Sequence, residues 1–179
     1  MSGGPARYHS PAMEVRPAQL ADAEATRSIY NVEVTGSTVT FDLVPRTLAE
    51  QRAWIEEHQG AHPAVVAVED GAVAGFGSLS PFRERAAYAT SVEDSVYVAG
   101  QWRGRGVGRL LLAELVELAG RHGFHTVLAR ISGDNAASIA LHAGQGFELV
   151  GVEREVGRKF GRWIDVTVMQ RMLRSPPRP

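Results

Sequence analysis

The stretch that decides the fold runs from Val96 to Arg109 and reads VYVAGQWRGRGVGR. An apolar run typical of a strand ends there, and Gly104, Gly106 and Gly108 precede a long helical pattern. Glycine lets backbone approach a ligand closely and adopts dihedral angles that other residues avoid. The N-terminus of the following helix offers unpaired N–H groups and partial positive charge, which suit a phosphate. The spacing alone fits a phosphate-binding turn and a simple tight turn equally well.

Two other phosphate motifs are excluded by the same residues. A Walker loop requires Gly-Lys-Ser/Thr, which is absent from this loop. A dinucleotide fingerprint requires G-x-G-x-x-G, whereas the glycines here are spaced G-x-G-x-G. Arg103, Arg105 and Arg109 would add positive charge around a bound phosphate.

Outward from this loop, hydrophobic periodicity predicts the element order βααβββαβαββ. The predicted strands cover residues 14–17, 64–69, 72–80, 90–98, 126–131, 147–156 and 162–172. The predicted helices cover residues 20–34, 47–58, 107–122 and 135–143. This order is typical of an α/β (α+β) domain whose mixed, largely antiparallel sheet of six to seven strands is flanked by about four helices.

Local signals support several of these boundaries. Thr47 and Glu50 form a capping box at the start of the second helix. Asp70-Gly71 is a hairpin turn signal between two strands. In the first helix Ala25, Ile29 and Val32 have helical spacing, and residues 157–161 join the last two strands.

Composition bounds the class of protein. The chain has 179 residues, no cysteine and a net charge of −1, and its 19 basic residues form no run. A single domain over 13–173 is expected, with a disordered leader at 1–12 and a disordered tail at 174–179. Disulfides, thiolate metal sites and cysteine nucleophiles are excluded. We expect a cytoplasmic protein that binds neither nucleic acid nor membranes, since both a concentrated basic face and a long apolar span are missing.

The loop also carries a resemblance to a known family. RGRGVG at 103–108 matches the R/Q-x-x-G-x-G/A signature of GNAT acetyltransferases, and the element order agrees over residues 13–173. Segments 92–98, 134–138 and 157–166 resemble the phosphinothricin N-acetyltransferase branch of that family. The resemblance implies the GNAT fold, acetyl-CoA as co-substrate, and acetylation of a small amino acid such as phosphinothricin, methionine sulfoximine or methionine sulfone. It also implies a homodimer that associates through the last strands.

The resemblance further implies which residues hold acetyl-CoA. Backbone groups of Val96, Tyr97 and Val98 would lie along the pantetheine arm, and an N–H near Val98 would polarise the thioester carbonyl. Asn135 matches the family's asparagine that bonds this arm, although a helix cap explains it equally well. The full implied set for the cofactor is Val96, Tyr97, Val98, Arg103, Gly104, Arg105, Gly106, Val107, Gly108, Arg109, Asn135 and Ser138.

Two residues are candidates for proton transfer. Glu93 stands where the branch carries its proposed general base, on a strand face with Ser95 and Tyr97. His142 stands four residues before Gly146, where many GNAT enzymes have a tyrosine that reprotonates the CoA thiolate. Imidazole titrates near neutrality and can donate a proton. The alternatives are a solvated strand glutamate and a packed helix histidine. The other histidines show no ligand spacing, so no metal is expected.

The loop before the Glu93 strand is a candidate acceptor site. By resemblance, Arg83, Arg85 and Tyr88 would face the acid groups of the acceptor, and arginine matches carboxylate geometry through paired hydrogen bonds. Exposed arginines that only confer solubility are the alternative. Phe41 and Lys159 are further candidates for the pocket wall. Two other functions remain open: a GNAT enzyme that acetylates another amine or a protein N-terminus, and a non-catalytic acetyl-CoA sensor.

Overall fold

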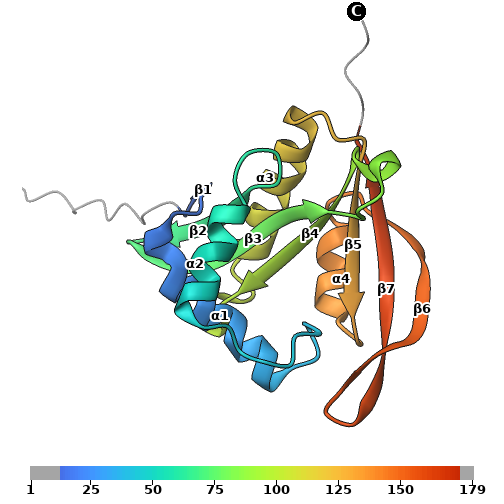
Figure 1. Cartoon of the computed structure of the whole chain (residues 1–179), viewed down its shortest axis with the longest axis horizontal. Helices are drawn as coiled ribbons and strands as arrows, with labels where there is room; N and C mark the ends of the chain where they lie inside the picture. The colour runs from blue at the N-terminus through green and yellow to red at the C-terminus, as the bar shows by residue number, and fades with distance from the viewer. Residues whose placement is uncertain (1–12, 174–179) are drawn as a thin grey trace, which may run out of the picture.

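A computed structural model describes residues 13–173, which form one seven-stranded sheet in the order β1-β2-β3-β4-β5-β7-β6 (Figure 1). The strands are β1 (Glu14–Pro17), β2 (Ala64–Glu69), β3 (Ala72–Pro81), β4 (Ser91–Val98), β5 (Thr126–Ser132), β6 (Glu148–Lys159) and β7 (Arg162–Met172). The helices are α1 (Ala23–Gly36), α2 (Leu48–Glu57), α3 (Val107–Arg121) and α4 (Ala136–Ala143). The predicted element order is confirmed, while the predicted leader and tail lie outside the described residues.

The capping box marks the start of α2 as predicted, whereas the turn between β6 and β7 differs from the prediction. The Thr47 hydroxyl accepts from the Glu50 amide at 3.2 Å, and Glu50 accepts from the Thr47 amide at 2.7 Å. The predicted connection at 157–161 is too long, because β6 continues to Lys159 and only Phe160 and Gly161 form the turn. Both turn residues have positive φ, 51° and 74°, as a two-residue hairpin turn of this twist requires.

The buried face of α1 agrees only in part with its apolar pattern. Ala23, Tyr30 and Val34 are buried, whereas Val32 is 65% exposed. The preceding segment is a 3-10 turn over Leu20–Asp22, so the α-helix starts later than its apolar pattern suggests. Periodicity therefore identified the helix, and of its apolar positions Ile29 packs against the core whereas Val32 does not.

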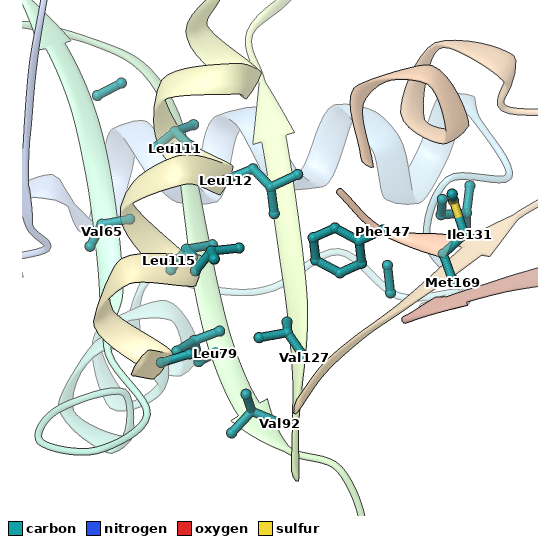
Figure 2. Close-up of a cluster of buried hydrophobic side chains, with 14 of the residues drawn as sticks. Val65, Leu79, Val92, Leu111, Leu112, Leu115, Val127, Ile131, Phe147 and Met169 are labelled. Atoms are coloured by element: carbon teal, nitrogen blue, oxygen red, sulfur yellow. The ribbon is translucent and has the colours of Figure 1, made fainter. Parts of the chain in front are cut away.

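Helices cover both faces of the sheet. α1 and α2 lie on one face, and α3 lies on the other (Figure 1). Leucines 111, 112 and 115 of α3 pack against the strand residues Val65, Leu79 and Val127 (Figure 2). A Cβ at Gly77 of β3 would lie 2.9 Å from the Leu115 side chain and 2.8 Å from the Ser95 carbonyl oxygen. Glycine at this position therefore lets α3 approach the sheet closely.

The sheet is split in its middle, where β4 and β5 separate from each other. β4 and β5 are parallel and pair only over Ser91–Glu93 with Thr126–Leu128. Residues 94–98 of β4 keep β3 as their neighbour, and residues 129–132 of β5 keep β7. The two strands diverge beyond Glu93 and Leu128 (Figure 1). This split positions the candidate site.

Candidate active site

A cleft of about 890 Å³ occupies the split between β4 and β5. Its lining includes residues 94–98 of β4, 129–132 of β5 and 162–165 of β7. The end of α1 and the following loop contribute on one face of the sheet, and the N-terminal parts of α3 and α4 contribute on the other. The cleft therefore reaches both faces of the sheet.

One wall of the cleft is a strand edge. Val96, Tyr97 and Val98 pair with Gly77, Phe76 and Gly75 of β3, and no described strand pairs with their other edge. An unpaired strand edge presents N–H and C=O groups that an extended ligand can join as an additional strand. These three residues line the cleft, and their contact with an acetyl-CoA arm stays a prediction.

The glycine loop forms one end of the cleft. Gly104 and Gly106 have φ angles of 76° and 85°, which L-residues rarely adopt. Gly106 is the N-cap of α3, so no side chain caps the helix. The first helical hydrogen bond runs from Leu110 to the Gly106 carbonyl, which leaves the amides of residues 107–109 available to an anion. A Cβ at Gly108 would come within 3.2 Å of Leu141, so this glycine lets α3 approach α4.

The three loop arginines have different surroundings. Arg103 lines the cleft, ion-pairs with Glu33 of α1 and donates from Nε to the Val98 carbonyl at 3.2 Å. The guanidinium of Arg105 lies 4.6 Å from the centre of the Trp102 ring. Arg105 and Arg109 are exposed and do not line the cleft. Only Arg103 is therefore held against the cleft.

The start of α4 contributes polar groups. The Asn135 side chain accepts from the Ser138 amide at 3.0 Å, so it caps the helix as the alternative reading proposed. Both residues also line the cleft. The Asn135 amide nitrogen has no hydrogen bond to any described residue, so the cap leaves a donor for a ligand.

His142 of α4 lies deep in the same cleft, where it is paired with a residue that sequence reasoning missed. Its Nε2 lies 3.0 Å from Asp94 Oδ2, and its Nδ1 lies 2.7 Å from the Ser138 carbonyl oxygen. The His142 and Asp94 side chains are only 5% and 1% exposed. Burial alone would lower the pKa of His142, but the bond to Asp94 and its charge outweigh burial and raise that pKa. The surroundings of His142 therefore favour the protonated form of its imidazole.

Asp94 carried a signal in the sequence. Strand alternation places it on the face of Val92 and Val96, which is turned toward α3 and the core. A carboxylate on a buried face needs a partner, because an unpaired buried charge is costly. Its second oxygen, Oδ1, is buried without a hydrogen-bond partner among the described residues.

Glu93 lies at the point where β4 and β5 separate. It pairs with Leu128 in the last parallel pair, and the next residue, Asp94, lines the cleft. Glu93 itself is partly buried and is not in the lining. Burial raises the pKa of its carboxyl, opposed by the charge of Arg130 and reinforced by Asp94. A carboxylate whose pKa lies nearer neutrality is suited to general base work.

A second, smaller cavity of about 350 Å³ lies beside this point. Arg83 lines it, and its guanidinium is 5.0 Å from the Phe82 ring centre and 5.8 Å from that of Tyr88. Tyr88 and Arg85 are exposed and line neither cavity. Of the predicted acceptor loop, the structure therefore places Arg83 at a cavity.

The two remaining acceptor candidates lie outside both cavities. Lys159 is buried and donates from Nζ to the carbonyl oxygens of Thr40 at 2.8 Å and Glu33 at 3.3 Å. Burial lowers the pKa of its ammonium, opposed by the charges of Asp42 and Glu33. The Phe41 ring lies against Gly157, where a Cβ would come within 2.4 Å of it. Both residues therefore fasten the β6–β7 hairpin to the loop after α1.

Two features are absent from residues 13–173. No helix there is long and apolar enough to cross a membrane. No group of three or more histidine, aspartate or glutamate side chains is gathered there as a metal site.

Comparison with known proteins identifies the family. The profile described as "Acetyltransferase (GNAT) family" matches residues 26–147, and the chain belongs to this family. The phosphinothricin N-acetyltransferase of Streptomyces coelicolor is 41% identical over 90% of this chain and 96% of its own length.

Two solved structures share the fold. A phosphinothricin acetyltransferase from Sinorhizobium meliloti, solved in complex with acetyl-CoA, superposes with a TM-score of 0.87 at 40% identity, covering 90% of this chain and 88% of that one. The ribosomal-protein-alanine N-acetyltransferase of Brucella melitensis superposes with a TM-score of 0.87 at 42% identity, covering 89% and 99%. The protein is thus a GNAT N-acetyltransferase, and its similar relatives bear names that imply different acceptors.

Proposed function

We propose that this enzyme transfers the acetyl group of acetyl-CoA to the α-amine of a small amino acid or analogue of the phosphinothricin and methionine sulfone type. The observation that carries the proposal is the cleft itself. It brings an unpaired strand edge, the uncapped N-terminus of α3 and the buried Asp94–His142 pair into one space, with Glu93 beside it.

The residues present fit acetyl-CoA. The free edge of Val96–Val98 suits the amide-bearing arm, and the amides of residues 104–109 suit the pyrophosphate. Asn135 has a donor left for the arm, and an N–H near Val98 is proposed to polarise the thioester carbonyl. Acetyl-CoA supplies an activated acetyl group, and the chain supplies orientation and proton transfer.

Glu93 is proposed as the general base. The amine of an amino acid has a pKa of about 8–10 and is mostly protonated at neutral pH, so a proton must leave before attack on the thioester. Glu93 stands at the end of the split and carries a raised pKa. A direct transfer and a transfer through one water both fit this position.

His142 is proposed as the proton donor to the departing thiolate. Its raised pKa favours the protonated imidazole that a donor requires, and Asp94 holds the ring in place. When the C–S bond breaks, the sulfur would take the electron pair and then the proton of His142. The acetylated nitrogen would lose its second proton to solvent, and solvent would return a proton to His142.

The assembly and location are also proposals. We infer a cytoplasmic homodimer that associates through β6 and β7. Exposed apolar side chains on this hairpin support the interface: Leu149, Val150, Val152, Val156, Phe160, Trp163 and Met172. A long apolar edge strand is a liability for a lone chain and is commonly covered.

An acceptor screen tests the reaction. Purified enzyme and acetyl-CoA are incubated with phosphinothricin, methionine sulfone, other amino acids, polyamines and N-terminal peptides, and free thiol release is recorded. We expect the free amino acids to be preferred. Preference for a peptide would instead favour the second candidate function, acetylation of a protein N-terminus, which the likeness to the Brucella enzyme supports.

Calorimetry with CoA tests the cofactor site. Gly106→Val should weaken CoA binding at least tenfold, because a β-branched residue at a φ of 85° distorts the amides at the helix N-terminus. Gly120→Ala is the matched control, since Gly120 lies in the same helix with open space around it. Equal CoA affinity in the folded Gly106→Val protein would remove the assignment.

Glu93→Gln tests the base. The substitution keeps the shape and removes the proton acceptor, so kcat at pH 7 should fall by roughly 10²–10⁴-fold while CoA affinity stays unchanged. A near-normal kcat would end the proposal for Glu93.

A further inference from the structure

The two cavities meet at one residue. Arg130 of β5 is the one described residue that lines both the cleft and the smaller cavity. It ion-pairs with Glu153 of β6, and the two side chains are 31% and 36% exposed. An ion pair that is this open to solvent is weak and exchanges partners readily. Arg130 is therefore a cation positioned at the junction and available to another carboxylate.

The smaller cavity has the size and chemistry of an amino-acid side-chain pocket. Its volume of about 350 Å³ lies within the range of small-ligand sites. Its walls are mostly apolar: Phe82, Leu128, Val150, Val152 and Val168. Arg83 is its second cation and can meet a polar head group on the acceptor side chain.

The position of the reacting amine indicates which of the two arginines, Arg130 or Arg83, would meet the acceptor's α-carboxylate. In a free amino acid the α-amine and α-carboxylate share one carbon, so the carboxylate must lie where the amine meets the acetyl group. Glu93, the proposed base, pairs with Leu128, two residues before Arg130. Arg130 lines the main cleft as well as the smaller cavity, whereas Arg83 lines only the smaller cavity. Arg130 thus lies at the reacting end and Arg83 on the side-chain side.

Building on the proposed function, we propose that Arg130 binds the α-carboxylate of a free amino-acid acceptor by exchanging Glu153 for it, with the acceptor side chain in the smaller cavity. This clamp selects against peptides and polyamines, which have no α-carboxylate beside the reacting amine. The α-carboxylate is thus bound by a residue outside the Arg83–Tyr88 loop that the sequence suggested, while Arg83 lines the side-chain pocket.

A double comparison tests the clamp. Binding of methionine sulfone and of its methyl ester to the CoA-loaded enzyme is measured by calorimetry in the wild type and in Arg130→Gln. The acid should lose about 10- to 100-fold in affinity, as expected when a charge-assisted bond is removed, and the ester should change less than threefold. The different amine basicities of acid and ester cancel, because each ligand is compared between two proteins.

Two further variants sharpen the result. Glu153→Gln removes the competing carboxylate and should tighten binding of the acid several-fold without affecting the ester. Arg154→Gln, an exposed arginine next along the same strand, is the control and should bind both ligands as the wild type does. If Arg130→Gln does not fold, Arg130→Lys replaces it, because lysine keeps the charge but not the paired hydrogen bonds. This variant should lose the preference for methionine sulfone over its methyl ester.

The outcomes separate this inference from the proposed function. Equal losses for acid and ester in Arg130→Gln, or weaker acid binding in Glu153→Gln, would overturn the clamp. Acetyl transfer by the wild type with no preference for the acid would overturn the clamp while leaving the acetyltransferase proposal intact. Failure of the wild type to acetylate any amine would instead refute the proposed function.

Discussion

At the scale of single residues, the site depends on charges that are buried or half-buried together. Asp94 and His142 are 48 positions apart and form a bonded pair beneath the cleft. The low dielectric of the interior strengthens such a pair and makes an unpartnered member costly. The pair therefore orients the imidazole, and the charge of Asp94 favours its protonated form.

Asp94→Asn should separate these two effects. The amide keeps the shape but removes the charge, so burial then dominates and the pKa of His142 should fall below its ordinary value of 6.5. NMR titration of the imidazole measures this directly. A donor must be protonated to act, so the basic limb of the kcat profile should move to lower pH.

The Asp94–His142 pair should also make the free energy of unfolding depend on pH. The pKa of His142 is higher in the folded protein than its ordinary value of 6.5, so the Asp94–His142 pair stabilises the fold fully below pH 6.5. This contribution to the free energy of unfolding is lost as the pH rises through the pKa of the folded state. The difference in unfolding free energy between wild type and Asp94→Asn should therefore shrink as the pH rises. Asp70→Asn, the same change at an exposed turn, should show no such trend. A His142 titration that Asp94→Asn leaves unmoved would contradict the assignment.

At the scale of elements, the split between β4 and β5 organises the chemistry. Three residue pairs join the strands, and beyond them the free edge of β4 faces the cleft. α3 holds this strand by packing on β3 and β4, which the small residues Gly75 and Gly77 permit. The position of the glycine loop thus depends on close helix–sheet packing.

Gly77→Ala should disturb this arrangement. The added methyl would lie 2.8 Å from the Ser95 carbonyl oxygen and 2.9 Å from Leu115, so backbone or helix must shift. Overpacking of this kind typically costs about 1–3 kcal/mol. Urea unfolding measures the loss, with Gly120→Ala as the control in which a more favourable helix residue should stabilise the protein. Unchanged stability in Gly77→Ala would show that α3 can move without cost.

At the scale of the whole molecule, the β6–β7 hairpin is the feature that a lone chain does not explain. β6 has 12 residues and is the last strand of the sheet order. Its Val156 and the Phe160 of the following turn are exposed apolar side chains. Two of its valines, Val150 and Val152, also line the smaller cavity. Association through this hairpin would connect the assembly to the acceptor site.

Charged substitutions on the hairpin test the dimer. The double variant Val156→Lys with Phe160→Lys should weaken self-association at least tenfold, because lysine at an edge opposes strand and apolar contacts. Sedimentation velocity measures the change. Val32→Lys is the control, since Val32 is similarly exposed on α1. A wild-type monomer at micromolar concentration, or equal effects of both changes, would contradict the proposed interface.

Much of the fold and half of the site could be predicted from the sequence, because their causes are local. Glycines at 104 and 106 require positive φ, apolar alternation marks the strands, and a capping box marks α2. These features act over a few residues and leave a direct pattern in the chain. The element order and the glycine loop follow from them.

Tertiary structure alone decided which side chains meet. Asp94 with His142, and Arg130 with Glu153, come together only because β4 is parallel to β5 and β7 returns antiparallel between β5 and β6. The same cause determined that Arg83 reaches a cavity while Arg85 does not, and that Lys159 is buried under the loop after α1. Such contacts depend on strand register and splay over distances that no local pattern encodes.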